Sequence, residues 1–123
     1  MAKIFNVKDA SHTQTERGTT YHLLNEAMGA QRMGVMLIDL APNLTTTGGT
    51  HYHRGRESAY IVIQGSATLL LNGTEHHLQA NTVVFLAPGD RHGVTQTGTE
   101  GFKMIEVYSP VDPDRVDVPD QTP

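Results

Sequence analysis

Cysteine is absent from this sequence of 123 residues, and so are long apolar runs. Without cysteine the chain can form no disulfide bond, no thiolate metal site and no cysteine nucleophile. Any metal must therefore be bound by nitrogen and oxygen atoms. The longest apolar stretches are far shorter than the roughly 20 residues of a membrane span, and residues 1–12 lack the apolar core of a signal peptide. We expect a soluble, cytoplasmic protein without a membrane partner.

Positive charge is also scarce. The sequence has 9 Lys and Arg residues and 13 Asp and Glu residues, which gives a formal net charge of -4. The sequence has no basic run, so it lacks the electrostatic footprint of a protein that binds nucleic acid or an anionic membrane. It also has no glycine-rich loop for a phosphate or a dinucleotide. We therefore expect a small-molecule substrate and no nucleic-acid partner.

Short apolar-rich segments recur along the chain, separated by Gly, Pro and Asn. This spacing is typical of an all-β sandwich or barrel, and long helical periodicity is absent. Asn72-Gly73 strongly indicates a hairpin, because a two-residue type I′ turn needs a positive φ at both positions. Residues 20–31 fit either a short helix or a hairpin, and we favour the hairpin. The predicted strands are 33–40, 58–64, 66–71, 74–78, 82–86, 93–97 and 102–108.

The length favours a single domain over residues 1–123. Within it we expect residues 1–18 to form an N-terminal arm or an edge strand. Residues 111–123 form a tail rich in proline and aspartate. Because proline cannot donate a ladder hydrogen bond, we expect this tail to lie outside the sheet, either as an arm across the surface or disordered.

The most informative feature is a pair of histidines, His51 and His53, followed by Glu57 and, much later, by His92. Residues i and i+2 of a strand project from the same face, so two imidazoles can converge and a later strand can add a third. Three imidazoles and a carboxylate suit one divalent transition metal (Fe, Mn, Ni, Co, Cu or Zn), with positions left open for substrate. We predict a metal site with these four ligands.

These residues lie in two segments that resemble the paired motifs of the cupin superfamily, over about residues 40–110. The first family motif reads Gly-x5-His-x-His-x3,4-Glu-x6-Gly, and the second reads Gly-x5-Pro-x-Gly-x2-His-x3-Asn. The matching positions here are His51, His53, Glu57 and Gly65, then Asn81, Ala87-Pro88-Gly89, His92 and Gln96. The resemblance implies an all-β fold, the single cupin barrel also called a double-stranded β-helix or jelly roll.

One departure from the first motif concerns a ligand. Seven residues separate Glu57 from Gly65, where the family pattern has six. Counting back from Gly65, the glutamate position falls on Ser58, and a one-residue slip turns a strand residue to the opposite face. A bulge near Gly55 would restore Glu57 to the site. The alternative is a site of three histidines.

Two polar residues are predicted to lie beside the metal. Strand alternation places Tyr60 on the face of Val62, and Gln96 on the face of His92. Tyr60 would orient or protonate a substrate, unless it is simply a packed sheet tyrosine. Gln96 would orient one of the metal-binding side chains by a hydrogen bond.

For a metal-binding, single-domain cupin, the resemblance implies dioxygenase, lyase or decarboxylase, and isomerase chemistry. We expect a mononuclear metal-dependent enzyme that binds and polarises a small oxygenated organic substrate, stabilising an enolate or delivering dioxygen. Dioxygenase-type oxidation is the first prediction, and lyase or decarboxylase chemistry is the second. The alternative is a non-catalytic or isomerase-type cupin that binds a sugar or similar ligand. Because cupins pair sheet edges across dimers, we also expect a homodimer.

Overall fold

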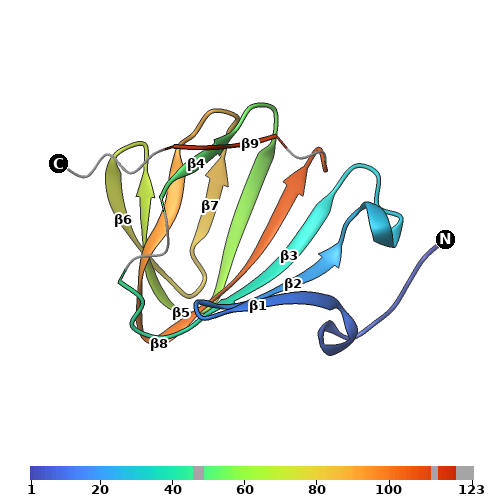
Figure 1. Cartoon of the computed structure of the whole chain (residues 1–123), viewed down its shortest axis with the longest axis horizontal. Helices are drawn as coiled ribbons and strands as arrows, with labels where there is room; N and C mark the ends of the chain where they lie inside the picture. The colour runs from blue at the N-terminus through green and yellow to red at the C-terminus, as the bar shows by residue number, and fades with distance from the viewer. Residues whose placement is uncertain (46–48, 112–113, 119–123) are drawn as a thin grey trace.

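Two long strands, β5 (Glu57–Leu71) and β8 (His92–Ser109), organise the computed structural model, which describes residues 1–45, 49–111 and 114–118. They pair antiparallel along almost their whole length (Figure 1). Both strands curl around the molecule, and each has a glycine at φ +79° midway, Gly65 in β5 and Gly101 in β8. The sequence predicted two separate strands in each of these segments, and in the structure each pair is one continuous, bent strand.

The remaining elements complete a curled sheet of nine strands within the described residues. Its path is β1-β2-β3-β8-β4-β9, and β5 joins β6, β7 and β8. This arrangement confirms the predicted all-β jelly-roll fold. The other elements are η1 (Val7–Asp9), β1 (Ser11–Thr15), β2 (Gly18–Leu24), η2 (Glu26–Met28), β3 (Gly34–Leu40), β4 (His51–His53), β6 (Thr74–Gln79), β7 (Val83–Leu86) and β9 (Arg115–Asp117).

The predicted turn at Asn72-Gly73 is confirmed, with φ of 48° and 85° at its two residues. It joins β5 to β6, and Leu71 pairs with Thr74 across it. In the 20–31 region, β2 and β3 pair antiparallel, as the favoured hairpin requires, and the short 3-10 helix η2 lies in the loop. Strand β1 lies within residues 1–18, where we expected an arm or an edge strand, and its sequence SHTQT has no apolar alternation and all five residues are exposed.

The two ends of the described chain lie at edges of the sheet. Strand β1 pairs with β2 at one edge. At the other edge, residues 115–117 form β9, which pairs with β4. These residues join the sheet, contrary to the expectation for the 111–123 tail, because they include no proline and pair along one side only. The prediction for residues 112–113 and 119–123 falls outside the described residues.

The core fills the barrel from the inward faces of the long strands. In β5, Ser58, Tyr60 and Val62 are buried while the residues between them are less buried or exposed, which is the period of two expected for a strand with one face inward. Eight residues form the apolar core, namely Tyr60, Val62, Ala67, Leu69, Leu78, Leu86, Phe102 and Met104. None of the described helices has the length and apolar character needed to cross a membrane.

Replacing Gly65 with alanine should destabilise the protein more than replacing Gly73 does. Both glycines have a φ near +80°, where a Cβ atom costs about 1–2 kcal/mol. A Cβ at Gly65 would also overlap the carbonyl oxygen of Gly101, whereas a Cβ at Gly73 meets no atom within 4 Å. Urea unfolding of both variants measures the difference. Equal losses of unfolding free energy would contradict the close approach of β5 and β8.

Candidate metal centre

The histidines His51, His53 and His92 converge at one end of the barrel. Strand β4 presents the first two, and His92, the first residue of β8, pairs directly with His51. The ring centroids lie 4.3 Å apart for His51 and His92, 5.2 Å for His51 and His53, and 5.9 Å for His53 and His92. One ligand nitrogen from each ring lies within 4.8 Å of the other two. The three nitrogens therefore surround one point.

Hydrogen bonds fix the tautomers of two of these rings. Nδ1 of His53 donates to Oδ1 of Asp114 over 2.9 Å, and Nδ1 of His92 donates to the backbone carbonyl of Asp90 over 2.9 Å. Because both acceptors lack a hydrogen, the proton must lie on Nδ1 in each ring. Nε2 is then left with its lone pair available, which is the form in which histidine binds a metal.

A network around Asp90 holds His92 in place. The carboxylate of Asp90 accepts hydrogen bonds from the backbone N–H of Ala87 and from the side-chain amide of Asn72. The carbonyl oxygen of the Asn72 side chain accepts in turn from the backbone N–H of Arg91. The turn between β5 and β6 is therefore tied to the loop that precedes His92, so His92 is positioned from two sides.

Burial keeps the three imidazoles neutral. Burial is the largest cause that lowers the pKa of His51 to about 3, and repulsion from Arg115 and from any proton on His92 adds to it. Burial also lowers the pKa of His53 and of His92 below the usual value. At neutral pH a cation therefore meets few competing protons here. The donor set, its tautomers and its protonation state all fit a divalent transition metal held by three nitrogens.

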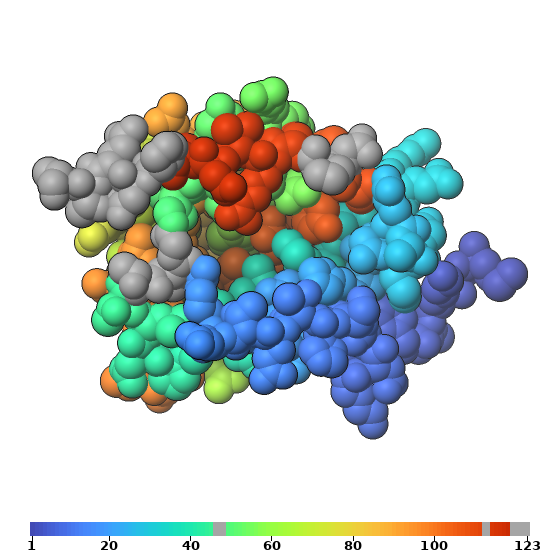
Figure 2. All heavy atoms as spheres, viewed as in Figure 1, coloured from blue at the N-terminus to red at the C-terminus, as the bar shows by residue number. Residues whose placement is uncertain are grey.

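His51 and His53 line a cavity of about 820 Å³. In Figure 2 the β1–β2 hairpin, in blue, and β9, in red, lie on opposite sides of a hollow in the surface. Apolar residues from two strands, β3 and β8, form one wall of the cavity: Met36, Ile38, Leu40, Val94 and Met104. Polar and charged groups that face it include Arg56, Tyr60, Glu106 and Arg115. A cavity of this size and mixed lining is typical of a site for a small organic molecule.

Tyr60 and Glu106 face each other across the paired strands β5 and β8, inside this cavity. Each is only 5% exposed. The position of Tyr60 agrees with the sequence prediction, and its ring lies 6.1 Å from that of His92. Burial, together with the nearby Glu106 carboxylate, raises the pKa of Tyr60 well above the usual value. Its hydroxyl therefore stays protonated and can donate a hydrogen bond.

Glu106 was not among the predicted site residues. Burial raises the pKa of its carboxyl, and the guanidinium of Arg56 opposes this effect. The signal that would have found it is strand alternation, since Phe102 and Met104 precede it on the same face of β8 and both are buried.

The structure does not bring Glu57 to the three histidines. The side chain of Glu57 is exposed and that of Ser58 is buried, so the inward position belongs to the serine. The seven-residue spacing to Gly65 is the reason, because β5 pairs regularly from Glu57 to Val62 and no bulge reverses its phase there. The geometry favours the three-histidine alternative.

Gln96 also lies away from the cluster, because its side chain is exposed. In the pairing of β5 with β8, Thr68 lies opposite Gln96 and Leu69 lies opposite Val94, so Thr95 is an extra residue in β8. Such a bulge shifts the alternation of the strand. As a result Val94 lines the cavity while Gln96 faces outward.

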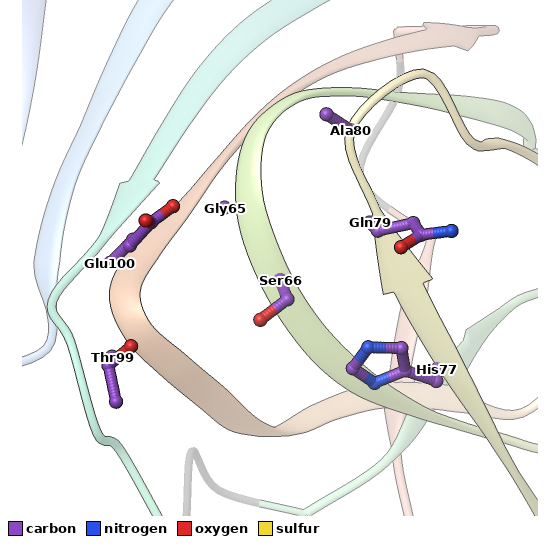
Figure 3. Close-up of a pocket in the computed structure, with 7 residues that line it drawn as sticks. All are labelled: Gly65, Ser66, His77, Gln79, Ala80, Thr99 and Glu100. Carbon is purple, nitrogen blue, oxygen red and sulfur yellow. The ribbon is translucent and has the colours of Figure 1, made fainter.

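A second pocket, of about 450 Å³, lies where β5 and β8 bend (Figure 3). One histidine, His77, lines it beside Gln79, Ser66 and Glu100. Within the described residues, the cluster of His51, His53 and His92 is the one group of three or more potential ligands close enough to share an ion. The large cavity is therefore the candidate site.

Comparison with known proteins agrees with this geometry. Residues 36–108 match the family model described as a cupin domain. The chain belongs to the cupin family. This cupin is 31% identical over 104 residues to the tetracenomycin polyketide synthase protein TcmJ of Streptomyces glaucescens, an alignment that covers 84% of this chain and 67% of TcmJ.

Solved cupin structures share the fold. The polyketide cyclase RemF from Streptomyces resistomycificus has a TM-score of 0.79 at 24% identity, covering 96% of this chain and 86% of RemF. KdgF from Halomonas has a TM-score of 0.76 at 16% identity, covering 93% of this chain and 98% of KdgF. At these identities the likeness establishes the architecture of this cupin and leaves its chemistry to the site.

Replacing Asp114 with alanine should weaken metal binding by this cupin about 10- to 100-fold, because His53 loses the partner that orients its ring. Besides His53, Asp114 accepts the backbone N–H of Gly55 over 2.7 Å. Competition with a chromophoric chelator measures the affinity for Zn²⁺. The matched control is Asp117→Ala on β9, whose carboxylate pairs with Arg115. Equal affinities of the two variants would contradict the orienting role.

Proposed function

We propose that this cupin binds one divalent transition metal through His51, His53 and His92 and acts on a small substrate with neighbouring carbonyl oxygens. The observation that carries the proposal is the cluster of three neutral imidazoles, two with fixed tautomers, of which His51 and His53 line an 820 Å³ cavity. When bound, such a cation would polarise a carbonyl group as a Lewis acid. The chain itself supplies the shape and polarity of the cavity and its proton-carrying groups.

The substrate class we propose is a 1,3-dicarbonyl compound of the polyketide type. TcmJ is named as a polyketide synthase protein and RemF as a polyketide cyclase. Carbon–carbon bond formation through an enolate needs no redox partner, and it suits a cavity with one apolar wall and several polar groups. These points favour enolate-stabilising chemistry over the dioxygenase-type oxidation predicted first.

Arg56 is the residue we propose for binding a negatively charged substrate oxygen. Its guanidinium carbon lies 4.0 Å from the centroid of the Tyr108 ring, and its Nε lies 4.0 Å from Oδ1 of Asp114. The side chain is 12% exposed, and Nε is buried with no hydrogen-bond partner among the described residues. Stacking holds the guanidinium in position, and a charged donor beside the cavity favours an oxyanion.

The apolar wall would contact the hydrocarbon part of the substrate. Met36 and Met104 line the cavity from neighbouring strands. Flexible thioether side chains adapt to irregular apolar shapes. The wall and Arg56 together would orient a substrate that is apolar at one end and oxygenated at the other.

We also propose that the working unit is a homodimer. Four large apolar side chains are exposed on β5 and β7, with exposed fractions of 41% for Ile61, 44% for Ile63, 66% for Val83 and 61% for Phe85. Ile61 pairs with Val83, and Phe85 pairs with Ala59 two positions along β5, so the residues share one outer face. A contiguous apolar patch of this kind favours association, and a second copy of the chain would cover it.

Metal-free protein is expected to take up about one equivalent of Co²⁺ or Zn²⁺. The His92→Ala variant should lose this binding, because one of three ligands is gone, whereas Glu57→Ala should keep it, because that side chain is exposed. Elemental analysis after dialysis measures the content. Retention by His92→Ala, or its loss in Glu57→Ala, would contradict the three-histidine site.

A substrate-like probe tests the proposed chemistry. Acetylacetone should raise the melting temperature of the metal-loaded protein and leave that of the chelator-treated protein unchanged, since ligand binding stabilises the folded state by mass action. Differential scanning fluorimetry with and without chelator gives the comparison. Equal stabilisation in both conditions would instead support a binding module that does not use a metal.

The Phe85→Glu variant should be monomeric at micromolar concentration, where the parent protein is dimeric, because a buried unpaired carboxylate disfavours the interface. Light scattering coupled to size-exclusion chromatography gives the mass. Met33→Glu, at a residue 47% exposed but outside the patch, is the matched control and should remain dimeric. A monomeric parent protein would rule out the dimer.

A further inference from the structure

Glu106 is an unusual residue for its position, because a carboxyl group is seldom buried without a charged partner. It lies near the C-terminal end of β8 and is 5% exposed, and its side chain lines the cavity. Within the described residues, none of the ion pairs involves Glu106. It also lies outside the cluster of metal-binding nitrogens. Neither an ion pair nor the histidine cluster therefore explains why the carboxyl group of Glu106 is buried in the cavity.

The neighbours of Glu106 balance its two protonation states. Its strand partners are Met36 on β3, which is apolar, and Tyr60 on β5, whose hydroxyl is buried. The positive charges that act on it come from Arg56 and from Arg115 on β9. Burial favours the neutral acid, whereas the two guanidinium groups and the buried hydroxyl of Ser58 on β5 favour the carboxylate. A buried acid that faces the cavity, with its pKa raised by burial and opposed by nearby positive charge, can take up and return a proton, as acid–base catalysis requires.

The other groups around the cavity are less suited to carry a proton. Two of the histidines use Nδ1 to donate to Asp114 and to the backbone carbonyl of Asp90. Their Nε2 atoms would bind the proposed metal. Tyr60 keeps its proton, because burial holds the pKa of its hydroxyl high. Of the acidic residues that line the cavity in the described part of the chain, Glu106 is buried and Glu16 is exposed.

We propose that Glu106 is the catalytic acid–base residue of this cavity, an inference that rests on the proposed function. Its carboxylate oxygen takes the proton from the carbon between two carbonyl groups, and the C–H electron pair becomes part of an enolate. The enolate carbon then forms a bond to a second carbonyl carbon. The electron pair of that C=O bond moves onto oxygen, which receives the proton back from Glu106. Nothing is oxidised or reduced, and the carboxylate is regenerated.

Proton exchange at carbon tests this role directly. The probe is ethyl 2-methylacetoacetate, whose single α-hydrogen exchanges for deuterium in D₂O and is followed by NMR. The Zn²⁺-loaded Glu106→Gln variant should exchange it about 10²- to 10⁴-fold more slowly than the parent protein. Glu106→Asp should recover part of the rate because it restores a carboxylate. The control Glu75→Gln removes an exposed carboxylate on β6 and should exchange at the parent rate.

A second readout counts protons instead of turnover. Acetylacetone binding is measured by calorimetry in buffers of different ionisation enthalpy, under conditions where Glu106 begins as a carboxylate. If the probe binds as its enolate, Glu106 keeps the proton in the parent protein and little is released to the buffer. The Glu106→Gln variant should release about one proton for each molecule bound. A residue that only supported the fold would not change this count.

The outcomes separate the two proposals. If the parent protein exchanges the α-hydrogen no faster than His92→Ala does, both the proposed function and the role of Glu106 are wrong. If the parent protein accelerates exchange and Glu106→Gln matches it, with the same proton count, the proposed function stands and the role of Glu106 is overturned. Slower exchange with altered proton release, at unchanged Zn²⁺ content, supports the role.

Discussion

The antiparallel pairing of β5 with β8 runs from Glu57 opposite Ser109 to Leu71 opposite His92, and both the core and the site depend on its register. One half of the pairing places Tyr60 opposite Glu106 inside the cavity, and the other half brings the start of β8 to β4. Because the side-chain period is two, a slip of one residue would exchange the inner and outer faces of a whole half-strand. The bends at Gly65 and Gly101 allow each strand to contribute to both halves.

Two carboxylates near the histidines have opposite protonation behaviour because their surroundings differ. Burial alone would raise the pKa of Asp114, but hydrogen bonds from Gly55 and His53 outweigh it and lower the pKa. Asp114 therefore stays ionised and orients the His53 ring by accepting a hydrogen bond from its Nδ1. At Glu106 burial outweighs the Arg56 guanidinium, the Ser58 hydroxyl and Arg115, so the pKa of its carboxyl rises. The balance between burial and hydrogen-bond donors, more than residue type, separates an orienting acid from one that can exchange its proton.

Much of the fold was predictable from local chemistry. The Asn72-Gly73 turn, the strands on either side of it and the His51/His53 pair all follow from conformational preference and strand alternation, which act over a few residues. The sequence pattern placed Glu57 and Gln96 wrongly at the candidate metal site. The face of the sheet to which a residue points depends on the exact number of residues between it and a bend or bulge. One residue too many before Gly65, and one extra residue at position 95, each reverse the face that a regular pattern predicts.

Asp114 escaped prediction for a different reason. It contacts His53 across 61 positions of sequence, and no periodic pattern marks such a pairing. Both Asp114 and β9 follow all the barrel strands in chain order. During synthesis, the strands of the barrel can therefore meet before the segment that orients His53 has emerged. If the histidine cluster binds a cation as proposed, a cation arriving early would meet a His53 ring that is still able to rotate, and high-affinity binding would wait until Asp114 has been added.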